Sequence, residues 1–417
     1  MKSFSLYLHI PFCLHKCPYC DFNTYAVSRI PEEEYVNALL AELDAASMQE
    51  RWRGRQLSSI YFGGGTPSLF CVASIERIIQ SACSLFELHP LAEVTLEANP
   101  GAVDHDYLRG LRQVGVNRLS LGAQSFHLET LKVLGRLHEP AHVTLAVENA
   151  HQVGITDINI DLIHGVPSQS VEMVERDLKI ALKLAPTHIS AYGLTIEKGT
   201  PFYGAVRRGA LVLPGESTLV EMFQLVNSTL AGAGFIHYEI SNFARFGKFA
   251  RHNLSYWEGR DYLGLGAGAH SFWRDPARAF HGERWSNFAL PNRYIEETSA
   301  TGMAVAWRDE LSREALMFEF FFLGLRKRDG ISLNEFQKGF GLTFEEAYPQ
   351  TSTILLDQEF LQMKNGRLSL TEKGLLVADS VIENFVEVEC STPRPKPYET
   401  ASLQPVGGKI AVGGGRE

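Results

Sequence analysis

The chain has 417 residues and a formal net charge of −9 at neutral pH, with 45% hydrophobic and 21% charged residues. This length predicts two or three domains with a core that needs no disulfide scaffold, and six cysteines are too few to form one. The acidic balance argues against broad binding to nucleic acid. No apolar stretch is long enough for a spanning helix, and the N-terminus lacks a signal-peptide cleavage site, so we expect a cytoplasmic protein.

Short β-type runs alternate with amphipathic helical patterns over the first 245 residues or so. Alternation of this kind predicts parallel strands joined by crossover helices, arranged as an open doubly wound sheet or as a full or partial barrel. In each arrangement, ligand-binding groups lie at the carboxyl ends of the strands. The predicted strands cover residues 4–9, 58–62, 93–98, 118–122, 157–163, 188–194 and 237–240, and the predicted helices cover 32–43, 72–86, 106–114, 141–153, 171–184 and 218–231.

The pattern changes after about residue 245, where glycine, aromatic residues and histidine become frequent and periodicity is weak. Further on, a mostly helical region contains the segment LQMKNGRLSL, in which Asn365 and Gly366 predict the two-residue turn of a β-hairpin. The predicted order of helix, helix, hairpin and helix indicates a winged-helix-like module. The acidic net charge favours a packing or lid domain over a DNA-binding one. The last residues are rich in proline and glycine and predict a disordered tail. We therefore divide the chain into residues 1–240, 241–308, 309–390 and 391–417.

Cys13, Cys17 and Cys20 form a C-x3-C-x2-C pattern directly after the first predicted strand. Three thiolates on one loop can bind three irons of a cubane [4Fe-4S] cluster and leave the fourth iron open to a substrate or cofactor. The alternative is a zinc site with His9 or His15 as the fourth ligand, although structural zinc sites usually have a second pair of ligands.

This cysteine pattern, with Tyr19 between the second and third cysteines, resembles the radical S-adenosylmethionine (SAM) enzymes. The resemblance implies that SAM chelates the open iron and that the reduced cluster donates an electron to it. It also implies an α/β fold with a partial (β/α)6-type barrel, followed here by the mostly helical, winged-helix-like domain.

Other residues around the predicted pocket are polar groups at strand ends and a glycine turn. The turn FGGGTP resembles the SAM-binding glycine motif of the coproporphyrinogen oxidase-like branch, and its glycines allow backbone N–H groups to face a charged ligand. Glu97, Gln124 and Asp161 end successive strands, where the alternative to ligand binding is a helix cap or an inter-strand hydrogen bond. The resemblance implies that SAM is bound by Tyr7, Tyr19, Gly64, Gly65, Thr66, Glu97, Gln124, Arg136 and Asp161.

Two relatives within this branch fit the motifs that run over residues 4–385. Oxygen-independent coproporphyrinogen III oxidases carry a further cysteine two positions after the third, where this chain has Phe22, and a longer segment before the first strand. HemW-type haem chaperones carry H-N-x-x-Y-W, which occurs here from His252 to Trp257. The chain therefore resembles the HemW type more closely.

The resemblance implies that haem is bound at this motif. His252 offers an imidazole to haem iron, Tyr256 and Trp257 offer flat faces to the porphyrin, and His270 is a further candidate ligand. The alternative is a structural elbow in which these side chains satisfy a loop and fill the core.

A haem chaperone of this kind would bind a [4Fe-4S] cluster, SAM and haem. It would deliver haem to acceptor haemoproteins such as respiratory enzymes, with bacterioferritin-like donors, peripheral membrane association and a homodimer as further expectations. Two alternatives are an oxidase that decarboxylates coproporphyrinogen III and a haem-binding module with vestigial radical machinery.

Overall fold

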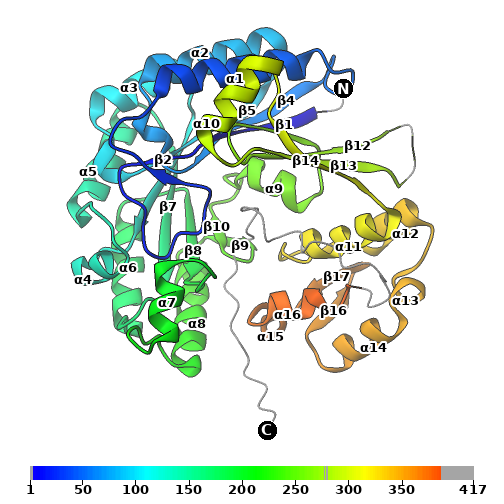
Figure 1. Ribbon diagram of the computed structural model, residues 1–417. Helices are drawn as coiled ribbons and strands as arrows, with labels where there is room; N and C mark the ends of the chain where they lie inside the picture. Colours follow the sequence, from blue (N-terminus) through cyan, green and yellow to red (C-terminus); the bar gives the residue numbers. More distant parts are fainter. Residues whose placement is uncertain (1–2, 277, 279, 387–417) are drawn as a thin grey trace.

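A twelve-stranded sheet forms the centre of the computed structural model, which describes residues 3–276, 278 and 280–386 (Figure 1). Its strand order is β14-β13-β12-β11-β1-β4-β5-β6-β7-β8-β10-β9, so the sheet is open, and the β9 edge makes a single antiparallel bridge between Glu239 and Lys327. Six neighbouring strands are parallel: β1 (Ser3–Ile10), β4 (Gln56–Gly64), β5 (Glu87–Ala98), β6 (Arg118–Gln124), β7 (Asp157–His164) and β8 (His188–Gly193). The predicted partial (β/α)6 barrel is therefore confirmed.

Crossover helices cover the outer face of these strands (Figure 1). They are α1 (Glu32–Ser47), α2 (Val72–Leu85), α3 (His105–Gln113), α4 (Leu128–Val133), α5 (Pro140–Gln152) and α6 (Val171–Lys183), and α7 (Pro201–Arg207) and α8 (Glu216–Gly232) follow β8. Side chains alternate across each strand, so one face of the sheet packs under the helices and the other lines the barrel. In β1, Phe4, Leu6 and Leu8 are buried in the core, and Tyr7 lines the interior cavity described below. Each buried apolar side chain contributes about 1.5–3 kcal/mol to folding.

The seventh predicted strand exists, but its direction differs from the expectation. β9 (Ile236–Glu239) pairs antiparallel with β10 (Asn242–Ala244), and β10 pairs antiparallel with β8. Only two residues separate β9 from β10, which is the length of a hairpin and too short for a parallel crossover.

Four further strands continue the sheet beyond β1 in the region where no elements were predicted. β11 (Tyr262–Leu265) is parallel to β1, and β12 (His270–Arg274), β13 (Gly282–Asn287) and β14 (Val305–Leu311) follow antiparallel. The helices of this region are α9 (Arg251–Trp257) and α10 (Pro291–Thr301). A Cβ at Gly264 would clash with the carbonyl oxygen of His270, and one at Gly266 with that of His9. Glycine is used here for close backbone packing, which obscures the strand pattern.

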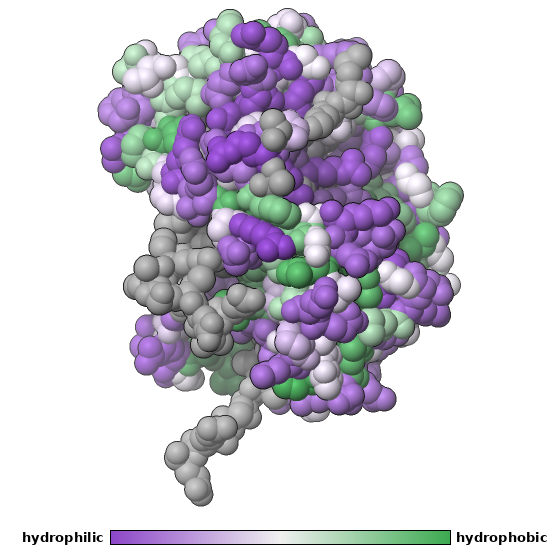
Figure 2. Space-filling view, turned by 90° about the vertical axis from the view of Figure 1, so that its right-hand side faces the viewer, coloured by the Kyte–Doolittle hydropathy of each residue, from purple (hydrophilic) through white to green (hydrophobic). Residues whose placement is uncertain are grey.

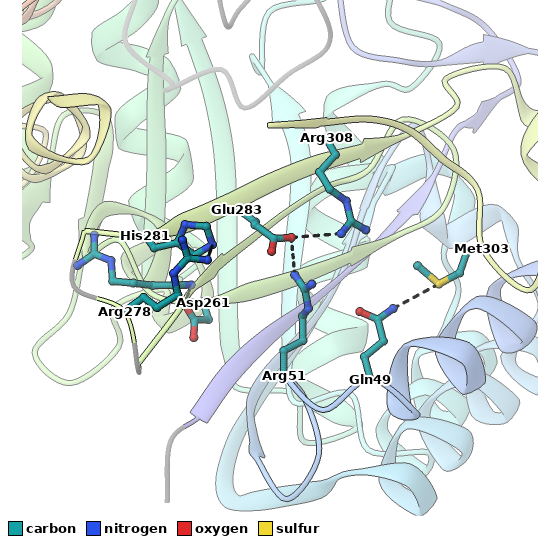
Figure 3. Close-up of polar contacts among 9 residues, drawn as sticks. Gln49, Arg51, Asp261, Arg278, His281, Glu283, Met303 and Arg308 are labelled. Carbon is teal, nitrogen blue, oxygen red and sulfur yellow. Dashed lines mark hydrogen bonds and ion pairs between the residues drawn. The ribbon is translucent and has the colours of Figure 1, made fainter. Parts of the chain in front are cut away.

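Polar contacts attach this extension to the first βα unit (Figure 3). Glu283 of β13 accepts hydrogen bonds from Arg51 at 2.9 Å and from Arg308 of β14 at 3.3 Å. Gln49 donates to the sulfur of Met303 at 3.6 Å. These contacts hold β13 and β14 against the segment between α1 and β4.

The C-terminal region has its own apolar core, built around rings such as Phe321, Phe336 and Phe344. Its hairpin turn has positive φ at Asn365 (53°) and Gly366 (71°), as a type I′ turn requires, so the predicted hairpin is confirmed. The elements are α11 (Arg313–Gly324), β15 (Ile331–Ser332), α12 (Leu333–Phe340), α13 (Phe344–Ala347), α14 (Pro349–Asp357), β16 (Leu361–Lys364), β17 (Arg367–Leu370), α15 (Glu372–Leu375) and α16 (Ala378–Glu383).

The predicted disordered tail, residues 391–417, lies outside the described residues. Among the residues that the structure does describe, no helix combines the length and apolar character needed to cross a membrane. On the face shown in Figure 2, hydrophilic residues predominate and hydrophobic ones occur in small groups between them.

Candidate functional site

A cavity of about 610 Å³ opens at the carboxyl ends of the parallel strands and extends to α9, β11–β13 and α11. Parallel strands place these ends at one rim, which is why polar residues far apart in the sequence meet there. Every site residue predicted from the sequence lines this cavity: Tyr7, Cys13, Cys17, Tyr19, Cys20, Gly64, Gly65, Thr66, Glu97, Gln124, Arg136, Asp161, His252, Tyr256 and Trp257. His270 lines it as well.

The three cysteines lie on a loop that is closed by two short strands. β2 (Phe12–Cys13) pairs with β3 (Tyr25–Ala26), and Lys16 ties the loop by donating to the carbonyl oxygens of Phe22 (3.1 Å) and Thr24 (3.2 Å). The loop thereby presents its thiols to the cavity rather than to the core of the protein.

Hydrogen-bond donors and a positive charge surround these thiols. Thr66 Oγ1 donates to Cys13 Sγ at 3.5 Å, and Arg136 Nη1 lies 3.9 Å from Cys17 Sγ. Burial raises the pKa of the Cys20 thiol to about 11, so a free thiolate is disfavoured and a bound cation is needed to stabilise it.

The geometry fits a cluster better than a single zinc ion. Within the described part of the chain, no three His, Cys, Asp or Glu side chains converge as ligands of one metal ion. A cubane gives each thiolate its own iron, so it does not require that convergence. His9 has both ring nitrogens engaged, with Tyr7 Oη at 3.0 Å and the Asn23 carbonyl oxygen at 2.9 Å, so it does not supply a fourth zinc ligand.

The glycine turn after β4 does not use its N–H groups as expected. The N–H of Gly64 donates to Glu97 (3.2 Å), that of Gly65 to the carbonyl of Ile10 (2.8 Å) and that of Thr66 to the carbonyl of Phe12 (2.9 Å). A Cβ at Gly65 would lie 2.6 Å from the Phe12 oxygen. The prediction that these N–H groups face a ligand is therefore wrong, because the turn needs glycine to pack against the cysteine loop.

The acids at the strand ends are held by internal hydrogen bonds. Asp161 accepts from Asn159 at 2.8 Å and from Ser120 at 3.1 Å, which is the inter-strand alternative considered above. Glu97 accepts from Tyr61 Oη at 2.7 Å, and burial raises its pKa to about 7. Both carboxyl groups still line the cavity.

Two polar atoms beside them are buried and have no hydrogen-bond partner among the residues that the structure describes, namely Gln124 Oε1 and Arg136 Nε. Gln124 also has a positive φ of 65°, a strained conformation for a residue other than glycine. An unpaired amide oxygen and an unpaired guanidinium N–H can satisfy the ammonium and carboxylate groups of an amino-acid ligand. The residues present therefore fit SAM.

The HNLSYW segment lies in α9, one residue after the helix begins at Arg251, and the histidine of the segment is buried. His252 is 1% exposed, and its Nδ1 lies 2.8 Å from Ser59 Oγ and its Nε2 2.8 Å from Tyr256 Oη. Its ring stacks on Tyr61 at 4.8 Å, and burial lowers its pKa to about 3. Tyr256 is partly exposed, so the end of the motif, rather than its first residue, is the accessible part.

Sequence reasoning did not find several residues that line the same cavity. Tyr61 lies in β4 between the buried Ile60 and Phe62, and the alternation of side chains along a strand could have placed it inside the barrel. Arg284, Glu319 and Phe322 come from β13 and α11, and only the packing of the C-terminal domain brings them to the cavity.

Comparisons with known proteins agree with this description. The model of the radical SAM superfamily matches residues 7–181, and that of the HemN C-terminal domain matches residues 311–377. The solved structure of coproporphyrinogen III oxidase (HemN) from Escherichia coli aligns with a TM-score of 0.78 and 24% identity, covering 92% of this chain and 90% of that one. The fold and the three-cysteine loop therefore define a protein of the radical SAM class.

Relatives of higher identity specify the family. The heme chaperone HemW of Lactococcus lactis is 35% identical, with 92% of this chain and 98% of the relative covered. That of Escherichia coli is 36% identical, with 93% and 99% covered. The mitochondrial radical S-adenosyl methionine domain-containing protein 1 of Danio rerio is 31% identical, with 92% and 86% covered. The chain belongs to the HemW family of haem chaperones.

Proposed function

We propose that this protein binds a [4Fe-4S] cluster, SAM and haem, and delivers the haem to acceptor haemoproteins, respiratory enzymes among them. One observation carries the proposal: a single cavity is lined by the three cysteines, the unpaired Gln124 and Arg136 groups, and the aromatic end of α9. In this proposal, the cluster, SAM and haem would occupy adjoining parts of one cavity.

Cys13, Cys17 and Cys20 would hold the cluster, with Thr66 and Arg136 reducing the negative charge on the thiolates. A reduced cluster supplies one electron to bound SAM. Gln124 and Arg136 would orient the amino-acid part of SAM, and Tyr19, partly buried beside the cysteines, would help to exclude water.

The haem would occupy the part of the cavity that lies between α9 and the C-terminal domain. Trp257, Tyr262 and Phe322 line that part, and Tyr256 packs edge-on against Tyr262 with ring centroids 4.7 Å apart. Aromatic walls suit a flat porphyrin. Arg284, paired with Glu319 at 2.7 Å, places a positive charge where a propionate could reach it.

The competing activity is decarboxylation of coproporphyrinogen III. Phe22, which replaces the further cysteine of the oxidase pattern, is 43% exposed beside the cysteine loop. This replacement disfavours the oxidase, and the likeness to HemN is a likeness of fold.

The deciding experiment is a haemin titration of the anaerobically reconstituted full chain, followed by absorbance. A parallel assay measures protoporphyrinogen IX formed from coproporphyrinogen III. Stoichiometric haemin binding without turnover supports the chaperone function. Turnover would support the oxidase instead, and haem binding without SAM cleavage under reduction would indicate a carrier with vestigial radical machinery.

A further inference from the structure

The position of His252 makes its imidazole a poor ligand for a metal in the cavity. Both ring nitrogens are engaged, one with Ser59 Oγ and one with Tyr256 Oη, each at 2.8 Å. One face of the ring stacks on Tyr61 at 4.8 Å, and the Tyr7 ring lies 6.3 Å away. To reach a haem iron, the imidazole would have to break a buried hydrogen bond, leave its partner unpaired and give up this aromatic packing, all of which are unfavourable.

Ser59, His252 and Tyr256 form a chain of two hydrogen bonds, and Tyr256 is at the end of it that faces the cavity. It is one helical turn beyond His252 on α9, lines the cavity and is partly exposed. Its only recorded hydrogen-bond partner in the described chain is His252 Nε2. A tyrosine oxygen is an established axial donor to haem iron.

We propose that Tyr256 Oη, rather than a nitrogen of His252, is the axial ligand of ferric haem, and that His252 is a positioning residue for that phenol. This inference rests on the proposed function, because it assumes that haem is the cargo. It concerns only which atom of α9 binds the iron.

The step balances with groups in the structure. As the bond from Oη to ferric iron forms, the phenol O–H bond breaks and its proton leaves to solvent through the open cavity. His252 stays neutral, with its ring proton on Nε2, 2.8 Å from the phenolate oxygen, and Nδ1 accepts a hydrogen bond from Ser59 Oγ. No electron is transferred, so no oxidant or reductant is needed. The phenolate keeps a hydrogen bond from Nε2–H, which fixes its direction.

A second pair in the barrel provides a matched control. Tyr238 Oη lies 2.7 Å from His188 Nε2, with the two rings at 67°. Tyr238 is buried and does not line the cavity. The two Tyr–His pairs therefore differ in their access to the cavity, and only Tyr256 can reach a bound haem.

The test is resonance Raman and absorbance spectroscopy of ferric haemin bound to the reconstituted full chain, with the haem-free protein as blank. We expect iron–phenolate vibrations in the wild type and in Tyr238→Phe, and their loss in Tyr256→Phe with at least tenfold weaker haemin binding. His252→Ala should keep the vibrations while binding more weakly. Equal iron content and circular dichroism in all variants would show that they are folded.

The inference is overturned if Tyr256→Phe keeps the wild-type spectrum, or if only Tyr262→Phe or only His252→Ala changes the iron ligand. In each of those cases haemin still binds, so the proposed function stands. Failure of the wild type to bind haemin would instead reject the proposed function.

Discussion

The carboxylate of Glu93 accepts the backbone N–H of His252 at 3.1 Å and that of Arg251 at 2.9 Å, although Glu93 belongs to β5. α9 has no side-chain cap of its own, since its N-cap residue is Ala250. A buried acid from the barrel therefore takes the place of a cap and sets where the HNLSYW helix begins.

Glu93→Ala should lower the free energy of unfolding by about 1–3 kcal/mol, because two N–H groups lose their acceptor. Glu93→Gln keeps one acceptor oxygen and should lose less. Urea unfolding gives the loss, and hydrogen exchange at Arg251 and His252 shows where it arises. Glu87→Ala, an exposed position on the same strand, is the control. Unchanged exchange at α9 in Glu93→Ala would show that the acid does not hold the helix.

Cys17→Ser should lose most of its iron after anaerobic reconstitution, because a serine oxygen is a poor substitute for a thiolate on iron. Iron and sulfide analysis with electron paramagnetic resonance measures the loss. Cys83→Ser, an exposed cysteine on α2, should retain the cluster. Equal iron in the two variants would argue against Cys17 as a ligand.

Thr66→Val removes the hydroxyl that donates to Cys13 Sγ at 3.5 Å and keeps the shape of the side chain. Hydrogen bonds to cluster sulfurs favour the reduced, more negative state, so the reduction potential should become more negative. Thr66→Ser should behave like the wild type. A redox titration monitored by electron paramagnetic resonance tests this, and a potential in the valine variant equal to the wild type would contradict it.

Glu239 is buried, and Asn242, the backbone of residues 240 and 241, and Arg326 lie near its carboxylate. Burial raises its pKa from 4.5 to about 7. The folded state therefore holds this proton more tightly than the unfolded state. The stabilisation is complete below about pH 4.5 and is lost as the pH rises through about 7.

The stability of the wild type relative to Glu239→Gln should accordingly fall by an amount on the order of 3 kcal/mol between those limits, and no further above them. Urea unfolding of both proteins across this pH range measures the difference in unfolding free energy. Both proteins have the same histidines, so the histidine contributions to the pH dependence cancel in this difference. A difference independent of pH would show that Glu239 ionises as freely in the folded protein as in the unfolded one.

Local sequence patterns were sufficient for much of the barrel. The six parallel strands and the longer helices between them follow from alternation and helical periodicity, which each segment carries by itself, whereas the short helices α4 and α7 were not predicted. The Asn365-Gly366 turn follows from the two positive φ angles that it requires. The cysteine spacing likewise places three thiols on one loop, because residues so close in sequence cannot separate far in space.

The pairing of distant segments was decided only by the tertiary structure. β11 joins β1 because glycines allow the backbones to approach, which no periodicity reveals. The sequence identified His252 and Tyr256 as one motif, but it did not show that Ser59 and Glu93 bury the histidine and leave the tyrosine accessible. A hydrogen bond between strands far apart in the chain depends on their register, and the register is determined by the packing of the whole sheet rather than by either segment.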